Sequence, residues 1–131
     1  MKVAIVGGGG RVGAAVGVAL QLGGQPHEIL IIDVAKEMAE GEALDMLHAS
    51  SALSPQRIRA GDYADATGFD IVVHTAGLRR RPDESRLDLI NRNVSLTNQV
   101  CDALSQITLA PDWKLVVVAN PVDVLTFMCL E

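Results

Sequence analysis

Residues 2–13 have the sequence KVAIVGGGGRVG, in which a short apolar run is followed by four consecutive glycines and by a further glycine at position 13. We predict a buried strand over Lys2–Val6, because this run is short, apolar and ended by glycines. A helix is expected over Arg11–Leu22, where small apolar residues recur. A glycine loop between a strand and a helix directs backbone N–H groups and the positive end of the helix dipole at one point in space. The segment therefore predicts a phosphate-binding turn.

The spacing of the glycines fits a dinucleotide-binding fingerprint in two registers, Gly8-x-Gly10-x-x-Gly13 and Gly7-x-x-Gly10-x-x-Gly13. In either register the first glycine permits the tight turn, Gly10 lets a pyrophosphate approach the backbone, and Gly13 lets the helix pack close to the strand. The alternative for the motif alone is a flexible turn without a ligand. The candidate cofactor-binding residues of this loop are Gly7, Gly8, Gly10, Arg11, Val12 and Gly13.

An acidic residue follows at the position that this fingerprint requires. The second expected strand, 28–33, ends in Asp33, twenty residues after Gly13. A carboxylate there accepts hydrogen bonds from the adenosine ribose and repels the additional phosphate of NADP. Alone, Asp33 could be a solvated strand end. Together with the glycine loop it predicts that the cofactor is NAD.

The remaining chain alternates between helical and extended patterns. Further helices are expected over 36–51, over 86–108 and from about residue 122, and further strands over 57–61, 70–75 and 113–119. This alternation predicts one α/β domain over 1–131, a Rossmann doubly wound parallel sheet with strand order 3-2-1-4-5. A sixth strand, common in this fold, would have to follow Glu131. The faces expected to be buried are Val12, Ala15, Val16, Ala19 and Leu20 on the first helix, and Leu87, Ile90, Val94, Cys101 and Leu104 on the long one.

Composition excludes several classes of protein. The chain has 131 residues and a net charge of −5, which argues against a nucleic-acid surface. No stretch reaches transmembrane length, and Cys101 and Cys129 lack the spacing of metal ligands. We expect a cytoplasmic protein with no metal, no membrane partner and two reduced, buried thiols. Apolar side chains near the C-terminus predict self-association into a homo-oligomer: Leu125, Phe127, Met128 and Leu130.

Two polar segments are expected at the switch point of the sheet, where the order of the strands reverses. The loop that follows the 70–75 strand carries Arg79, Arg80 and Arg81 before the helix that begins at Arg86. Arg80 and Arg86 are candidates for binding an anionic substrate, because arginine suits bidentate carboxylate contacts. For Arg79 and Arg81 a solvated loop is the preferred interpretation. Thr75, Ala76 and Gly77 face the glycine loop as candidate cofactor contacts, and Asn120 is either a ligand contact or a turn residue.

The chain resembles the lactate/malate dehydrogenase family. The resemblance covers essentially the whole chain, in the order of that family. It rests on KVAIVGGGGRVG (2–13), LIID (30–33), GEALDMLHAS (41–50), TAGLRRRPDESRLDLINRN (75–93) and ANPVDVLT (119–126). The length of the glycine loop is similar to the malate dehydrogenase form, whereas ESRLDL after Asp83 is more similar to the lactate form.

The resemblance implies roles for three residues. Arg86 matches the catalytic arginine that polarises the substrate carbonyl, and Arg80 matches the specificity residue, which is arginine in malate dehydrogenases and glutamine in lactate dehydrogenases. Asn120 matches the asparagine that contacts substrate and nicotinamide ribose. The implied substrate is a small dicarboxylate, malate or oxaloacetate. The family's catalytic histidine has no counterpart among the three histidines of this chain, so we expect residues 1–131 alone to show no turnover.

Two alternatives remain open at this stage. One is a lactate or other 2-hydroxyacid dehydrogenase, against which Arg80 stands. The other is a non-enzymatic NAD-sensing Rossmann module, against which the arginine loop and the ANPVD segment stand.

Overall fold

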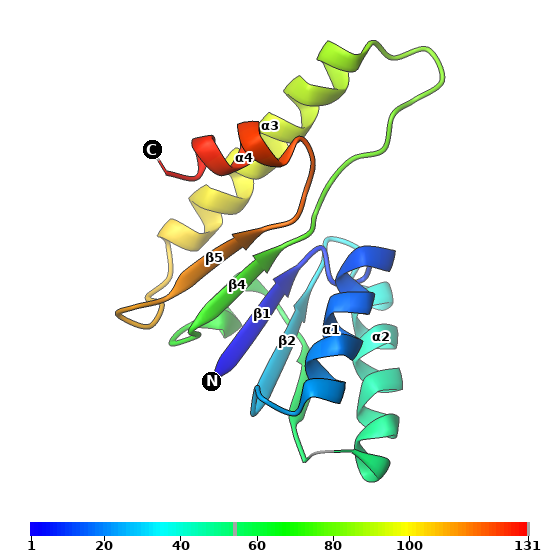
Figure 1. Ribbon diagram of the computed structural model, residues 1–131, viewed down its shortest axis with the longest axis vertical. Coiled ribbons are helices and arrows are strands. Elements are labelled where there is room, and N and C mark those ends of the chain that lie inside the picture. The colour runs from blue at the N-terminus through cyan, green and yellow to red at the C-terminus, as the bar shows by residue number, and fades with distance from the viewer. Residues whose placement is uncertain (54, 131) are drawn as a thin grey trace.

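The computed structural model describes residues 1–53 and 55–130, which form a five-stranded parallel sheet in the order β3-β2-β1-β4-β5 (Figure 1). The strands are β1 (Lys2–Val6), β2 (Glu28–Ile32), β3 (Arg57–Ala60), β4 (Ile71–His74) and β5 (Lys114–Val117). The predicted strand order and the predicted α/β class are confirmed. Each strand ends within two residues of its expected boundaries.

Helices connect the strands and cover both faces of the sheet. Figure 1 shows α1 (Arg11–Gly23) and α2 (Lys36–Ala49) on one side, and α3 (Arg86–Ser105) and α4 (Val122–Met128) on the other. Two short 3-10 helices, η1 (Ser50–Ala52) and η2 (Tyr63–Ala66), complete the order. No described helix combines the length and the hydropathy that crossing a membrane requires. The central strands β1, β2 and β4 are buried on both faces, which explains their continuous apolar residues, whereas the edge strand β5 is partly exposed.

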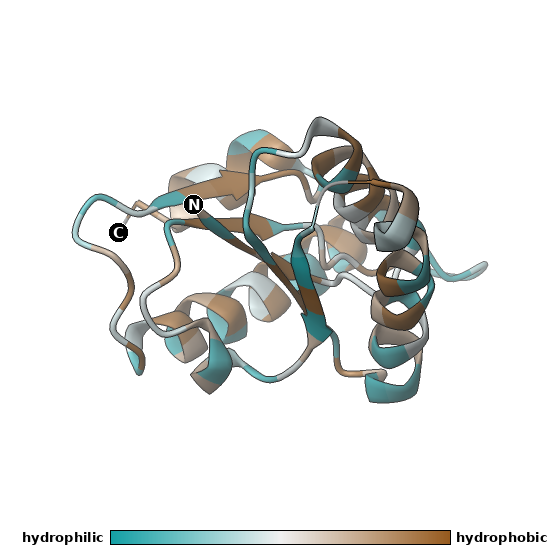
Figure 2. Ribbon diagram, turned by 90° about the horizontal axis from the view of Figure 1, so that it is seen from below, coloured by the Kyte–Doolittle hydropathy of each residue, from teal (hydrophilic) through white to brown (hydrophobic). Residues whose placement is uncertain are grey.

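The core consists of two apolar layers, one on each face of the sheet, and Figure 2 shows the apolar character of the central strands. Because side chains alternate along a strand, Ile29 and Ile31 of β2 face α1 and α2, whereas Leu30 and Ile32 face the side of α3. All four are nearly inaccessible to water. The carboxyl ends of the parallel strands lie along one edge of the sheet, and so do the loops that follow them.

The face that α1 buries differs in part from our prediction. Its buried residues are Gly13, Gly17 and Gln21, whereas Val12 is 54% exposed. A Cβ on Gly17 would lie only 3.0 Å from the Met46 side chain, so α1 packs closely at this glycine. Val16 and Leu20 of the predicted face also pack, partly buried, against the core. Hydropathy alone missed the buried glycines because it ranks glycine below valine.

The buried face of α3 agrees with the predicted one only in part. Leu104 is buried as predicted, together with Asn93, Thr97 and Val100, whereas Leu87, predicted to be in the core, is 66% exposed. The two polar side chains are buried because each has hydrogen-bond partners, as described below. At the C-terminal end, Leu125 is buried rather than exposed as predicted, while Phe127 and Leu130 are exposed. Leu125 is buried because α4 packs against α3.

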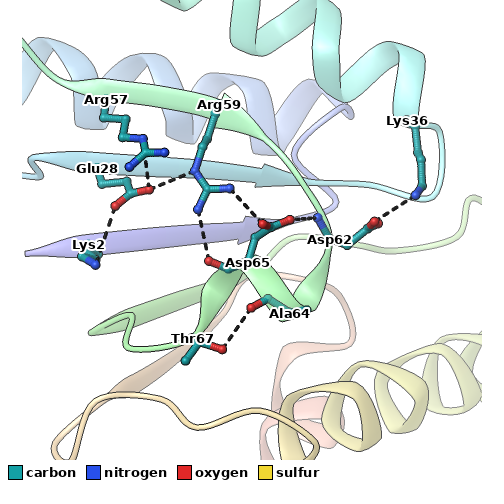
Figure 3. A network of polar contacts seen from close by, with 9 residues as sticks. All are labelled: Lys2, Glu28, Lys36, Arg57, Arg59, Asp62, Ala64, Asp65 and Thr67. Atoms are coloured by element: carbon teal, nitrogen blue, oxygen red, sulfur yellow. Dashed lines mark hydrogen bonds and ion pairs between the residues drawn. The ribbon is translucent and has the colours of Figure 1, made fainter.

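A network of charged side chains lies at the amino ends of the strands (Figure 3). Lys2, Glu28 and Arg57 are direct neighbours in the register of β1, β2 and β3. The Glu28 carboxylate is 7% exposed and lies 3.0 Å from Arg59 Nε, 3.7 Å from Arg57 Nε and 3.8 Å from Lys2 Nζ. Arg59 also pairs with Asp65 at 3.3 Å. The buried negative charge is thus surrounded by cations from all three strands.

Candidate NAD-binding site

The glycine loop forms a tight turn between β1 and α1. The N–H groups of Gly7 and Gly8 donate to the Ile32 carbonyl at 2.8 and 3.1 Å, and Gly10 N–H donates to the Gly7 carbonyl at 3.1 Å. These bonds join the end of β1 to the end of β2 and then reverse the chain into the helix. Gly7 has a φ of +80°, a conformation that residues with a side chain rarely adopt.

Close packing explains why the loop needs glycine at two positions. A Cβ on Gly7 would lie 2.5 Å from the Ala76 backbone nitrogen, and one on Gly13 would collide with the backbone of Gly7 and Gly8. Gly10 differs, because its nearest neighbour would be the Gly7 carbonyl oxygen at 3.3 Å. Apart from the residues next to it in the chain, no other atom of the described residues lies within 4 Å of that Cβ position. The space beside Gly10 is therefore open, as the approach of a pyrophosphate requires.

The first turn of α1 offers hydrogen-bond donors to that space. Gly10 is the N-cap and has no side chain to satisfy the helix, and Ala14 N–H is the first to bond within it, to the Gly10 carbonyl at 2.8 Å. The N–H groups of Arg11, Val12 and Gly13 donate no hydrogen bond within 1–53 and 55–130. Unpaired donors at a helix N-terminus, together with the helix dipole, suit a phosphate group.

Asp33 is held in place by two backbone N–H groups. Its carboxylate oxygens accept from Gly9 N–H at 3.1 Å and from Ala35 N–H at 3.0 Å. Asp33 therefore links the glycine loop to the segment that precedes α2. Each oxygen retains a free lone pair, so the carboxylate can still accept from the hydroxyls of a ribose.

A cavity of about 520 Å³ opens between the glycine loop, the end of β2 and the segment after β4. Of the predicted cofactor residues, the walls include Gly7, Gly10, Asp33, Thr75, Ala76 and Gly77. The Thr75 hydroxyl donates to the carbonyls of Val6 and Gly7 at 2.9 and 3.2 Å, so the two loops meet at the switch point as expected. The other predicted cofactor residues lie outside the walls: Gly8, Arg11, Val12, Gly13 and Asn120. The cavity, the open loop and Asp33 together fit a dinucleotide.

The structure adds wall residues that our sequence analysis missed. Lys36 and Asp62 form an ion pair of 3.0 Å at the rim, and Tyr63 lies beside them on η2. Burial, reinforced by the negative charge of Asp33, raises the pKa of Tyr63. A 3-10 helix of four residues has too little periodicity to be found from sequence. Hydropathy could have suggested the apolar walls Leu96 and Val100, but not which face of α3 they occupy.

The arginine loop, residues 77–85, projects beyond the edge of the sheet (Figure 1). Glu84 organises it: its carboxylate accepts from Arg92 Nη1 at 2.6 Å and from Arg81 N–H at 3.0 Å. The Arg81 N–H and the Arg92 guanidinium together lower the pKa of Glu84. At the start of the loop, Leu78 N–H donates to the buried Asn93 amide at 2.7 Å. The loop is thus fastened to α3 at both ends.

The candidate substrate-binding residues lie apart from the cavity. The Arg80 guanidinium is exposed and donates to the Glu84 backbone carbonyl at 2.9 Å. Arg86, the first residue of α3, is exposed and forms no ion pair with the described residues. Asn120 is exposed at the end of β5 and is followed by a cis peptide bond to Pro121. In this arrangement of the loop neither Arg80 nor Arg86 lines the cofactor cavity, and their binding of substrate stays a prediction.

No histidine of the chain lines the cavity. His27 is exposed and lies 2.8 Å from the N-terminal nitrogen, and His48 is exposed on α2. His74 is fully buried, with Nε2 3.0 Å from the Thr97 hydroxyl, and burial lowers its pKa. Within the described ranges, no three His, Cys, Asp or Glu side chains gather as metal ligands.

The fold and this site define a dinucleotide-binding Rossmann domain. All of residues 1–131 match the family described as lactate/malate dehydrogenase, NAD binding domain, and the chain belongs to that family. It is 41% identical over 127 residues to L-lactate dehydrogenase 1 of Clostridium acetobutylicum and 40% identical over 131 residues to the L-lactate dehydrogenase of a Synechococcus species. These alignments cover 97% and 100% of the chain but 40% and 42% of the relatives.

Solved structures agree with this assignment. The chain superposes on the minor L-lactate dehydrogenase of Enterococcus mundtii with a TM-score of 0.92 and 36% identity, covering 98% of the chain and 40% of that protein. For the malate dehydrogenase of Picrophilus torridus the TM-score is 0.89 and the identity 33%, covering 98% and 41%. The chain therefore spans about 40% of the length of these relatives. Its cofactor is NAD, as predicted.

Proposed function

We propose that this domain binds NAD with the pyrophosphate at the glycine loop and the adenosine ribose at Asp33. The observation that carries the proposal is the open space at Gly10 beside the unpaired donors of Arg11, Val12 and Gly13. Asp33 lines the same cavity, held by two N–H groups. A carboxylate fixed in this way binds ribose hydroxyls without reorganising, and it disfavours the phosphate of NADP.

We further propose that the protein containing this domain interconverts a small 2-hydroxy acid and the corresponding 2-oxo acid. NAD supplies the hydride chemistry, while the protein orients the reactants. Arg86 would stabilise negative charge on the substrate C2 oxygen, and Asn120 would position the substrate. Both side chains are exposed, so they are free to take these roles when the arginine loop moves toward the cavity.

Lactate and pyruvate are the first candidate substrate pair, because the two curated relatives described above carry the name L-lactate dehydrogenase. Malate and oxaloacetate form the second pair, for which Arg80 is the specific observation. A guanidinium whose one described hydrogen bond is to the Glu84 backbone carbonyl is available to pair with a second carboxylate. The acid–base group for either reaction lies outside the cavity described here, so we expect residues 1–131 to bind NAD without turnover.

The decisive experiment is calorimetric titration of the chain with NAD and with NADP. We expect NAD to bind at least about tenfold more tightly, and Asp33→Ser to narrow that difference. Gly10→Ala should weaken NAD binding about tenfold or more with little change in stability, because its Cβ would occupy the space for the pyrophosphate. Gly23→Ala is the matched control, since a Cβ there would meet nothing within 4 Å. Equal affinity for the two cofactors, or an unchanged Gly10→Ala variant, would contradict the proposal.

A further inference from the structure

Two cysteines that are 28 positions apart in the sequence meet where α4 packs against α3. Cys101 Sγ lies 3.5 Å from Cys129 Sγ, and both residues are half-buried. Cys101 belongs to α3, and Cys129 directly follows the last residue of α4. Our sequence analysis predicted two reduced, buried thiols and said nothing of their distance, because spacing along the chain does not reveal a contact between two helices. The structure brings the two sulfur atoms into direct contact.

We propose that Cys101 and Cys129 form a redox-active dithiol that peroxide converts into a disulfide linking α3 to α4. The geometry favours this product over a metal centre, because no third His, Cys, Asp or Glu joins the two sulfurs in the described part of the chain. A disulfide requires the sulfurs to approach to about 2.05 Å. Cys129 is the C-cap of α4, where its N–H is shared between the Leu125 and Thr126 carbonyls at 3.2 Å, so the approach of its sulfur requires no change inside the helix.

The chemistry proceeds in two steps. One thiol attacks hydrogen peroxide, the O–O bond breaks, and a sulfenic acid and one water form. The second thiol then attacks the sulfenic sulfur, the S–S bond forms, and a second water leaves. The two thiols together lose two electrons and two protons, and both electrons reduce the peroxide. Either thiol can make the first attack, because the two sulfur atoms are in contact and each is at hand to resolve a sulfenic acid on the other.

The bond would join two segments that lie on the substrate side of the proposed site. The helix α4 begins directly after Asn120 and Pro121, and α3 begins at Arg86. Val100, the residue before Cys101, lines the cavity, and Tyr63 is the other titratable group that interacts with Cys101. Oxidation would therefore fasten α4 to the wall of the cofactor cavity. The inference does not depend on the substrate, because it rests on the two sulfurs alone.

The test treats the folded 131-residue chain with hydrogen peroxide and follows it by intact mass and peptide mapping. We expect the loss of two hydrogen atoms from the monomer and a cross-link between the tryptic peptides 93–114 and 115–131. The cross-linked chain should melt about 5–10 °C higher than the reduced chain. The same treatment in denaturant should form the cross-link about tenfold more slowly, because only the fold holds the thiols together.

Two variants test the intermediate. Cys129→Ser and Cys101→Ser should each lose the cross-link within the chain and accumulate, on the remaining cysteine, a sulfenic acid that dimedone traps. Circular dichroism checks that both variants fold, and Cys129→Ala replaces Cys129→Ser if the serine variant does not. Cross-links only between different chains, or a rate that is equal in the folded and denatured chain, would overturn the proposal. NAD affinity of the reduced chain is measured in parallel, and its failure would affect the proposed function but not the dithiol.

Discussion

The two ends of the parallel sheet differ in whether their polar groups have partners within the protein. At the amino ends, Glu28 is buried among Lys2, Arg57 and Arg59, and the charges satisfy one another (Figure 3). At the carboxyl ends, the first N–H groups of α1 have no acceptor in the described chain, and the guanidinium of Arg86 has no ion-pair partner there. Polar groups that are already paired stabilise a fold, whereas groups left open are available to a ligand. The difference identifies the carboxyl edge as the binding edge.

The largest expected effect concerns the amino end. Glu28→Gln should lower the free energy of unfolding by about 3 kcal/mol, because it leaves cations around a buried site without their counter-charge. Arg57→Gln is the control, since the Arg57 side chain is 71% exposed and its loss should cost less than about 1 kcal/mol. Denaturant titration measures both values. NAD affinity should change by less than about twofold in either variant. A large loss of NAD binding in Glu28→Gln would contradict the separation of the two edges of the sheet.

The next effect concerns Arg80 in a full-length protein that carries this domain. Arg80→Gln should lower the ratio of kcat/KM for oxaloacetate over kcat/KM for pyruvate by about two decades, because a distal carboxylate then lacks its charged partner. Arg86→Gln should lower kcat for both acids, since both develop charge on the C2 oxygen. Steady-state kinetics with both acids is the measurement. An unchanged ratio would make Arg80 a surface arginine and leave lactate as the sole candidate.

A smaller effect is expected in the arginine loop. Glu84→Gln should accelerate tryptic cleavage at Arg79 and Arg80 about threefold to tenfold, because it weakens the contacts to Arg92 and to Arg81 N–H. Asp83→Asn is the matched control, as Asp83 is exposed and makes no hydrogen bond to another described residue. Since the pKa of Glu84 is lowered, its contribution is present above the ordinary glutamate range and is lost as the pH falls below it. Equal cleavage of both variants would show that Glu84 does not hold the loop.

A feature could be predicted from the sequence where it depends on a local pattern, and could not where it depends on packing between distant segments. Strand order, the glycine loop and the position of Asp33 depend on local patterns, and they are present as predicted. The face of α1 was predicted only in part, because close packing also selects Gly17, which hydropathy does not rank as a core residue. The path of the arginine loop could not be predicted, because it depends on Glu84 and Arg92, which lie eight residues apart on different segments. The Cys101–Cys129 contact depends on the packing of two helices, for which no local pattern exists.

The smallest effect concerns His74, the last residue of β4 at the binding edge. Its Nε2 contacts the Thr97 hydroxyl at 3.0 Å, while Nδ1 has no hydrogen-bond partner in the described chain, and burial lowers its pKa below 6.5. The folded chain therefore holds His74 neutral, whereas the unfolded chain protonates it below about pH 6.5. Its contribution to stability is complete above that pH and is lost as the pH falls toward the lowered folded pKa.

We expect the free energy of unfolding to decline between pH 7 and pH 5 by on the order of 1 kcal/mol more in the parent chain than in His74→Gln. His48→Gln, at an exposed position, is the control and should retain the slope of the parent chain. Urea titrations at several pH values measure these slopes, and equal slopes in the parent chain and His74→Gln would show that His74 is protonated alike in both states.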